Sequence, residues 1–136
     1  MKNNFIVVSI FLIIMTISWS SCKKSSDPET ETFIIQVDSI IHPDTINFGD
    51  NLTIKFYGYI GPDGCYAFDR LEPEYTTGTL SVTCYGIHTF ESLCTQAIVY
   101  MNGSTLQVSE MPIGQTEIKI MQPDGSSFSQ NVFVKE

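Results

Sequence analysis

The chain has 136 residues, which is the length of a single domain. Fifteen acidic residues against seven basic ones give a net charge of −8. That balance argues against a nucleic-acid partner, because such a partner requires a basic face on the protein.

The N-terminus has the organisation of a secretory signal. Residues 1–4 include one lysine, residues 5–17 are almost wholly apolar, and three serines follow by residue 21. A charged start, an apolar run of about 7–15 residues and a small-residue cleavage site are typical of such a signal. The run is shorter than the roughly 20 residues that span a bilayer. The alternative interpretation is an uncleaved membrane anchor.

Cys22 ends the stretch SWSSC, residues 18–22. This stretch resembles the lipobox of bacterial lipoproteins, in which a small residue precedes the cysteine that is lipidated and becomes the new first residue. The resemblance implies a signal peptide of residues 1–21 and a mature chain that starts at a lipidated Cys22. It also implies two or three acyl chains, and stable anchoring requires more than one.

Residues 22–32 are expected to form a lipidated flexible spacer. They are polar, contain proline and lack aromatic residues, so they cannot bury enough surface to fold. Lys23 and Lys24 either rest on anionic lipid or are merely solvated. Loss of Lys2 with the signal leaves six basic and 15 acidic residues, so the mature chain has a net charge of −9.

Strand signals dominate the chain from residue 33 onward. Apolar and polar residues alternate, β-branched and aromatic residues are frequent, and turn residues separate the runs. The expected extended segments are 33–37, 45–50, 51–60, the end of 61–68, 79–87, 94–101, 104–111, 115–121 and 127–134. Residues 69–78 are expected to be a polar loop, with or without a short edge strand, and residues 88–93 a connection.

Turn signals lie between several of these segments. Asn102-Gly103 separates two strand patterns and predicts a tight hairpin. Pro-Asp-Gly occurs at residues 62–64 and again at 123–125. In each copy the proline presets the first turn position, the aspartate bonds the nearby backbone and the glycine adopts a positive φ. These residues therefore need no functional explanation.

Seven to nine short strands in about 105 residues predict an all-β fold, a two-sheet antiparallel sandwich with Greek-key connections. The stretches FGDNLTIKFYGY, GCYAF and CTQAIVY, together with the terminal hairpin, resemble the immunoglobulin-like domains of small Bacteroidota lipoproteins. The resemblance implies an immunoglobulin-like β-sandwich domain over residues 33–136. It also implies a lipid-anchored protein at the outer membrane of a bacterial cell envelope, in either the periplasmic or the surface-facing leaflet.

An exported chain meets an oxidising compartment, so one disulfide is expected among Cys65, Cys84 and Cys94. All three pairings are open. Cys65 and Cys94 each begin a strand, and two strand starts can lie at the same end of a sandwich, so we favour Cys65–Cys94. Cys84 shares the core-facing register of Leu80 and Val82, where a free cysteine packs as a small apolar residue.

No catalytic residue, metal site or cofactor is predicted, and we expect that the protein is not an enzyme. His88 and Cys94 lie near one connection, but no motif supplies an orienting group or an oxyanion hole. Asp69, Glu72 and Glu74 form an acidic segment that lacks the spacing of a calcium-binding loop, and we expect it to be solvated. Outside the signal region, the chain also lacks the motifs of serine hydrolases, zinc proteases and phosphate-binding loops.

Tyrosines are the feature with binding potential. By alternation, Tyr57, Tyr59 and Tyr85 point away from the inferred core. Exposed tyrosines on a sheet can stack on sugars or anchor a protein partner, although tyrosine is also an ordinary strand residue. We therefore regard these three residues as a candidate binding face for a protein or glycan ligand.

Two hypotheses follow from the sequence. The favoured one is a membrane-anchored lipoprotein with a non-catalytic role in recognition, adhesion or assembly. The alternative is an envelope enzyme or enzyme inhibitor whose site is built from loops. A flat aromatic face favours the first hypothesis, whereas a deep pocket with converging polar groups favours the second.

Overall fold

The computed structural model describes residues 28–136. The expected signal and the lipidation site Cys22 lie outside the described residues, as do residues 22–27 of the expected spacer. The described part of the chain contains no apolar helix of membrane-spanning length.

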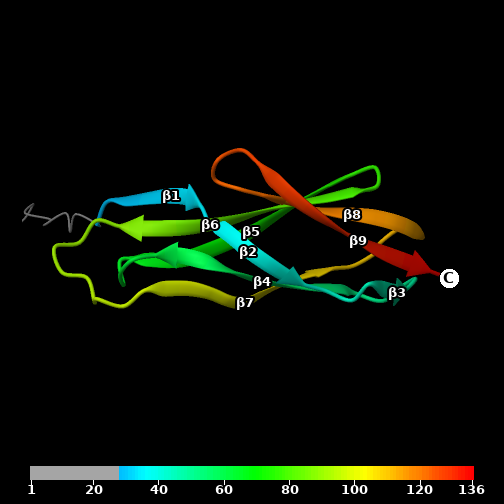
Figure 1. Ribbon diagram of the computed structural model, residues 1–136, viewed down its shortest axis with the longest axis horizontal. Coiled ribbons are helices and arrows are strands. Elements are labelled where there is room, and N and C mark those ends of the chain that lie inside the picture. Colours follow the sequence, from blue (N-terminus) through cyan, green and yellow to red (C-terminus); the bar gives the residue numbers. More distant parts are fainter. Residues whose placement is uncertain (1–27) are drawn as a thin grey trace, which may run out of the picture.

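Residues 28–136 form nine strands and no helix (Figure 1). The strands are β1 (Thr30–Ile34), β2 (Gln36–Ile41), β3 (Thr45–Asn47), β4 (Leu52–Gly61), β5 (Tyr66–Thr76), β6 (Thr79–Thr89), β7 (Val99–Val108), β8 (Gly114–Met121) and β9 (Ser127–Lys135). The predicted all-β fold is confirmed.

The strands are arranged in two sheets. The larger has the order β1-β6-β8-β9-β3, with β5 also paired to β6, and the smaller has the order β2-β4-β7. The sequence predicted antiparallel pairing throughout, and this prediction is wrong at two ladders. β6–β8 and β3–β9 are parallel pairs. The reason is the path of the chain. Between β6 and β8 it crosses to β7 in the other sheet and returns, so β8 runs in the same direction as β6.

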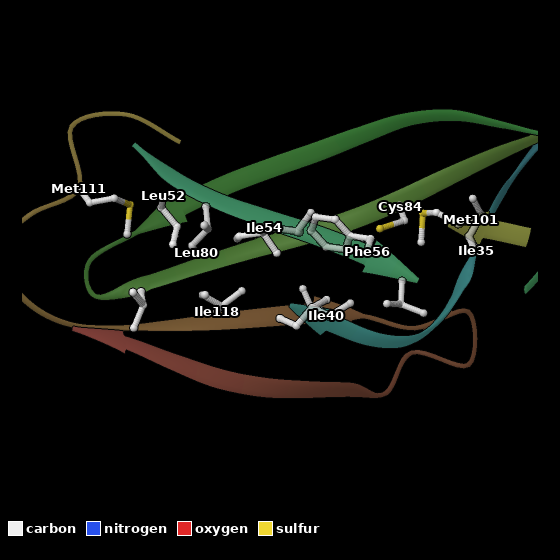
Figure 2. Packing of buried hydrophobic residues seen from close by; sticks show 14 of the residues in the cluster. Ile35, Ile40, Leu52, Ile54, Phe56, Leu80, Cys84, Met101, Met111 and Ile118 are labelled. Carbon is white, nitrogen blue, oxygen red and sulfur yellow. The ribbon is translucent and has the colours of Figure 1, made fainter. Parts of the chain in front are cut away.

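The core is formed by the facing sides of the two sheets. Strict alternation buries Leu52, Ile54 and Phe56 on β4, and it buries Leu80 and Cys84 on β6. Figure 2 shows these side chains together between the two sheets, with residues from β8 beside them. The pattern read from the sequence for β4 and β6 is therefore confirmed.

Residues 30–41 form two strands in different sheets, where the sequence predicted a spacer to residue 32 followed by one strand. β1 pairs with the end of β6, whereas β2 pairs with β4. Ile35 lies between them, is fully buried and donates its backbone N–H to the carbonyl of Cys84 at 2.8 Å. The expected spacer boundary was wrong by three residues, because residues 30–32 pair with β6 and need no apolar content of their own.

Within the segment 69–78, the structure shows the edge strand that the sequence had left open, and not a loop. The strand is longer than predicted, because β5 extends through Thr76 and pairs with β6 along its length. Most of its side chains are exposed, and only Tyr66 and Leu71 are half-buried. β5 is an edge strand, where proline and charged residues are tolerated. Its composition is therefore that of a loop although its backbone is fully extended.

The predicted hairpin at Asn102-Gly103 does not form, because β7 continues through both residues. Asn102 pairs with Tyr57 and Ser104 with Phe56, so Gly103 is an extra residue on β7. Its φ of 83° is the left-handed conformation that a bulge of this kind requires. A glycine of positive φ suits a bulge as well as a tight turn, and the long pairing with β4 selects the bulge.

The predicted terminal hairpin is confirmed, with β8 and β9 antiparallel around residues 122–126. In its turn, Ser126 donates its hydroxyl at 2.6 Å and its backbone N–H at 2.9 Å to Oδ1 of Asp124. These bonds hold the pKa of Asp124 below its ordinary value. The aspartate thus has the structural role expected from the turn motif.

Candidate functional site

The outer face of the three-stranded sheet carries a pair of exposed aromatic rings. Tyr59 on β4 and Tyr100 on β7 are directly opposite each other in the ladder. Their ring centroids are 5.9 Å apart and their planes make an angle of 74°, an edge-to-face contact. Tyr59 is 41% exposed and Tyr100 is 60% exposed. The two rings therefore offer a fixed aromatic surface to solvent.

Two neighbouring residues extend this surface. Tyr100 follows Val99, which packs against the core, and so points outward. Ile98 comes directly before β7 and is 59% exposed. Tyr57 lies two residues before Tyr59 and is half-buried. We call Tyr57, Tyr59, Ile98 and Tyr100 the β4–β7 aromatic face.

Gly103 leaves room beside Tyr57. A β-carbon at this glycine would lie 3.5 Å from the Tyr57 hydroxyl, which is an ordinary van der Waals distance. The bulge on β7 thus places its backbone directly against the tyrosine side chain. The aromatic face and the bulge are parts of one local arrangement.

The structure does not bring Tyr85 to this face, although the sequence grouped it with Tyr57 and Tyr59. Tyr85 is on β6, in the other sheet. The guanidinium carbon of Arg70 lies 4.3 Å from the centroid of its ring, so a cation already occupies one side of it. The grouping failed because alternation indicates which side chains leave the core, but not in which sheet their strand lies.

Two acidic residues of β5, Asp69 and Glu72, form ion pairs with Arg70, which lies between them in sequence. Glu72 and Glu74 border an open depression of about 390 Å³ that also includes Tyr85 and Lys119. Within residues 28–136, these carboxylates do not come close enough together to share a metal ion.

Cys94 has no thiol to act as a nucleophile, because it forms a disulfide with Cys65. The favoured pairing is confirmed, and the two Cα atoms are 5.3 Å apart. The ring of His88 stacks on that of Tyr66, with 4.2 Å between centroids and 13° between planes. His88 therefore has an aromatic packing role in this arrangement.

Cys84 is the free cysteine of the described chain and is fully buried. Burial raises the pKa of its thiol to about 12. Because the thiolate is the nucleophilic form, this residue is chemically inert in the folded protein. Its place in the core agrees with the register predicted from Leu80 and Val82.

Sequence reasoning missed Tyr100 and Ile98. The local sequence does not mark them, because Ile98, Val99 and Tyr100 are consecutive apolar or aromatic residues without polar alternation. The pairing of Tyr100 with Tyr59 depends on the register of β4 against β7, which no local pattern specifies.

The chain matches no family model, and no curated protein and no solved structure is significantly similar to it.

Proposed function

We propose that the protein is a lipid-anchored component of a bacterial cell envelope whose domain binds a protein partner without catalysis. Lipidation of Cys22, a position at the outer membrane and an immunoglobulin-like sandwich are parts of this proposal. The observation that carries it is the exposed Tyr59–Tyr100 pair. Tyrosine is enriched among the residues that contribute most to protein interfaces.

The geometry of the β4–β7 aromatic face favours a protein over a glycan. The two rings are inclined by 74° and so do not form one flat platform for a sugar. Ile98 adds a flexible aliphatic side chain beside them. β7 is also one of the two edge strands of its sheet in the described chain, and a free sheet edge can pair with a strand of a partner.

The test is site-specific photo-cross-linking of the full chain in the cells that produce it. A photoreactive amino acid replaces Ile98, which is exposed and adjacent to the tyrosine pair. We expect a discrete protein adduct that disappears in the Tyr59→Ala and Tyr100→Ala variants. Phe133→Ala is the control, because Phe133 is 49% exposed on β9 in the other sheet, and the adduct should persist in it.

Two results would contradict the proposal. One is an adduct that persists after both tyrosine substitutions although the variants remain folded by thermal denaturation. The other is an adduct that contains polysaccharide and no protein, which would favour a glycan ligand.

A further inference from the structure

The connection between β6 and β7, residues 90–98, exposes apolar side chains at one end of the molecule. Leu93 is 88% exposed and Phe90 is 50% exposed. No strand includes these residues, so neither side chain is placed by a ladder. A leucine left almost wholly in water is not explained by the packing of this domain.

This connection lies beside the start of the described chain. The backbone N–H of Phe90 donates to the carbonyl of Glu29 at 2.8 Å. Figure 1 shows the β6–β7 connection and the start of β1 at the same end of the long axis, with β3 and the C-terminus at the opposite end. The exposed apolar residues are therefore at the end of the domain nearest to Cys22 in sequence.

The connection is held by covalent and hydrogen bonds to the turn between β4 and β5. The Cys65–Cys94 disulfide fixes the residue that follows Leu93. Gly64 donates its backbone N–H to the carbonyl of Thr95 at 2.8 Å. A β-carbon on Gly64 would meet Oγ1 of Thr95, so the backbone of Gly64 lies directly against this side chain. Leu93 is thus presented from a fixed support.

The length of the preceding chain limits the distance to the proposed anchor. Pro28 follows Cys22 by six residues, and six residues span at most about 20–22 Å in any conformation. Anchoring at Cys22 therefore limits how far Phe90, which bonds Glu29, can lie from the lipid surface. A tether of this kind raises the effective concentration, so even a weak affinity for lipid is sufficient for contact.

Charge indicates which lipid surface fits. Glu91 lies between the two apolar residues and is exposed, and Glu29 is bonded to Phe90. Carboxylates beside the two apolar residues are repelled by an anionic surface, whereas Lys23 and Lys24, which follow Cys22 in sequence, are attracted to one. A zwitterionic phospholipid surface accepts the apolar side chains without this repulsion.

We infer that Phe90 and Leu93 insert into the interface of a zwitterionic phospholipid membrane and so orient the domain. The inference rests on the proposed lipidation of Cys22. In this orientation the long axis of the domain points away from the membrane surface. The β4–β7 aromatic face then points along the membrane surface, toward neighbouring envelope proteins. The disulfide and the Gly64–Thr95 contact are the support for the inserted side chains.

Tryptophan fluorescence tests the inference. The only native tryptophan is Trp19, in the expected signal, so the mature lipoprotein has no tryptophan background. The lipidated protein is reconstituted in phosphatidylethanolamine–phosphatidylcholine vesicles with brominated acyl chains, which quench nearby tryptophans. Leu93→Trp and Phe90→Trp report on the connection. Phe48→Trp is the matched control, because Phe48 is 61% exposed and bonds Lys135 at the opposite end.

We expect the emission of Leu93→Trp and Phe90→Trp to shift to the blue and to be lost in brominated vesicles, while that of Phe48→Trp stays unchanged. Equal emission from all three variants in vesicle-bound protein would overturn the inference and leave lipid anchoring intact. A blue shift without quenching by bromine would overturn it as well, because a protein surface would then cover Leu93. Protein that does not float with the vesicles would instead contradict lipidation itself.

Discussion

The side-chain amide of Gln122 hydrogen-bonds both backbone groups of Val37. Nε2 of Gln122 donates to the Val37 carbonyl at 3.0 Å, and the Val37 N–H donates to Oε1 at 3.2 Å. Val37 lies at the irregularity in β2, in the smaller sheet, whereas Gln122 follows β8 of the larger sheet. One side chain therefore replaces the missing ladder bonds of an edge strand and joins the two sheets.

Gln122→Ala should lower the free energy of unfolding by about 1–3 kcal/mol, because two partly buried backbone groups lose their partner. Urea denaturation measures this change. Gln107→Ala removes an exposed glutamine of β7 and should leave the midpoint nearly unchanged. Equal midpoints for the two variants would mean that water replaces the Gln122 bonds without loss.

Removal of the disulfide should destabilise the domain by roughly 2–4 kcal/mol, because the bond closes a loop between cysteines 29 residues apart. Cys65→Ser, Cys94→Ser and the double variant should show the same loss, since each removes the same bond. Thermal denaturation of the non-reduced proteins provides the comparison. Additive losses in the double variant would show that the cysteines act separately.

Gly103→Ala should cost about 1–2 kcal/mol, which is the penalty for a left-handed conformation in residues other than glycine. Space is not the cause, since a β-carbon there makes only ordinary contacts. Gly103→Asn should cost less, because asparagine tolerates this conformation better. If the two variants have the same urea midpoint, the φ of 83° is not what requires glycine.

Cys84 should make stability depend on pH in the alkaline range. Its pKa is about 12 in the folded protein, against an ordinary value of 9.0. Above pH 9 the unfolded chain therefore binds fewer protons than the folded one, and the free energy of unfolding falls as pH rises toward 12. Between pH 8 and pH 10, the wild type should lose more stability than Cys84→Ala. Parallel losses in urea titrations would contradict this origin.

The sequence predicted best what alternation controls. β4 and β6 alternate without interruption and are buried on one side, so the position of Cys84 and most of each strand followed from pattern alone. The end of β6 did not, because His88 and Thr89 were predicted to lie in a connection. The turn chemistry of Asp124 depends on its own neighbours, and it was also predictable. These features are local or repeat with the period of the strand.

Features that depend on partners distant in sequence were not predictable. β5 is extended because β6 offers it a ladder, and its own residues look like a loop. The Asn102-Gly103 signal fixes a positive φ but does not distinguish a turn from a bulge until the pairing with β4 is known. Tyr59 and Tyr100 form a site only through the same register, and for this reason half of the aromatic face was missed.

The mass of the mature protein from its native membrane tests the central claim, a lipid-anchored envelope protein, most directly. The account predicts a chain that begins at Cys22 and carries two or three acyl chains, and it predicts that Cys22→Ala abolishes both the processing and the membrane association. An unmodified chain that still contains residues 1–21, or a Cys22→Ala protein that fractionates and migrates like the wild type, would contradict it.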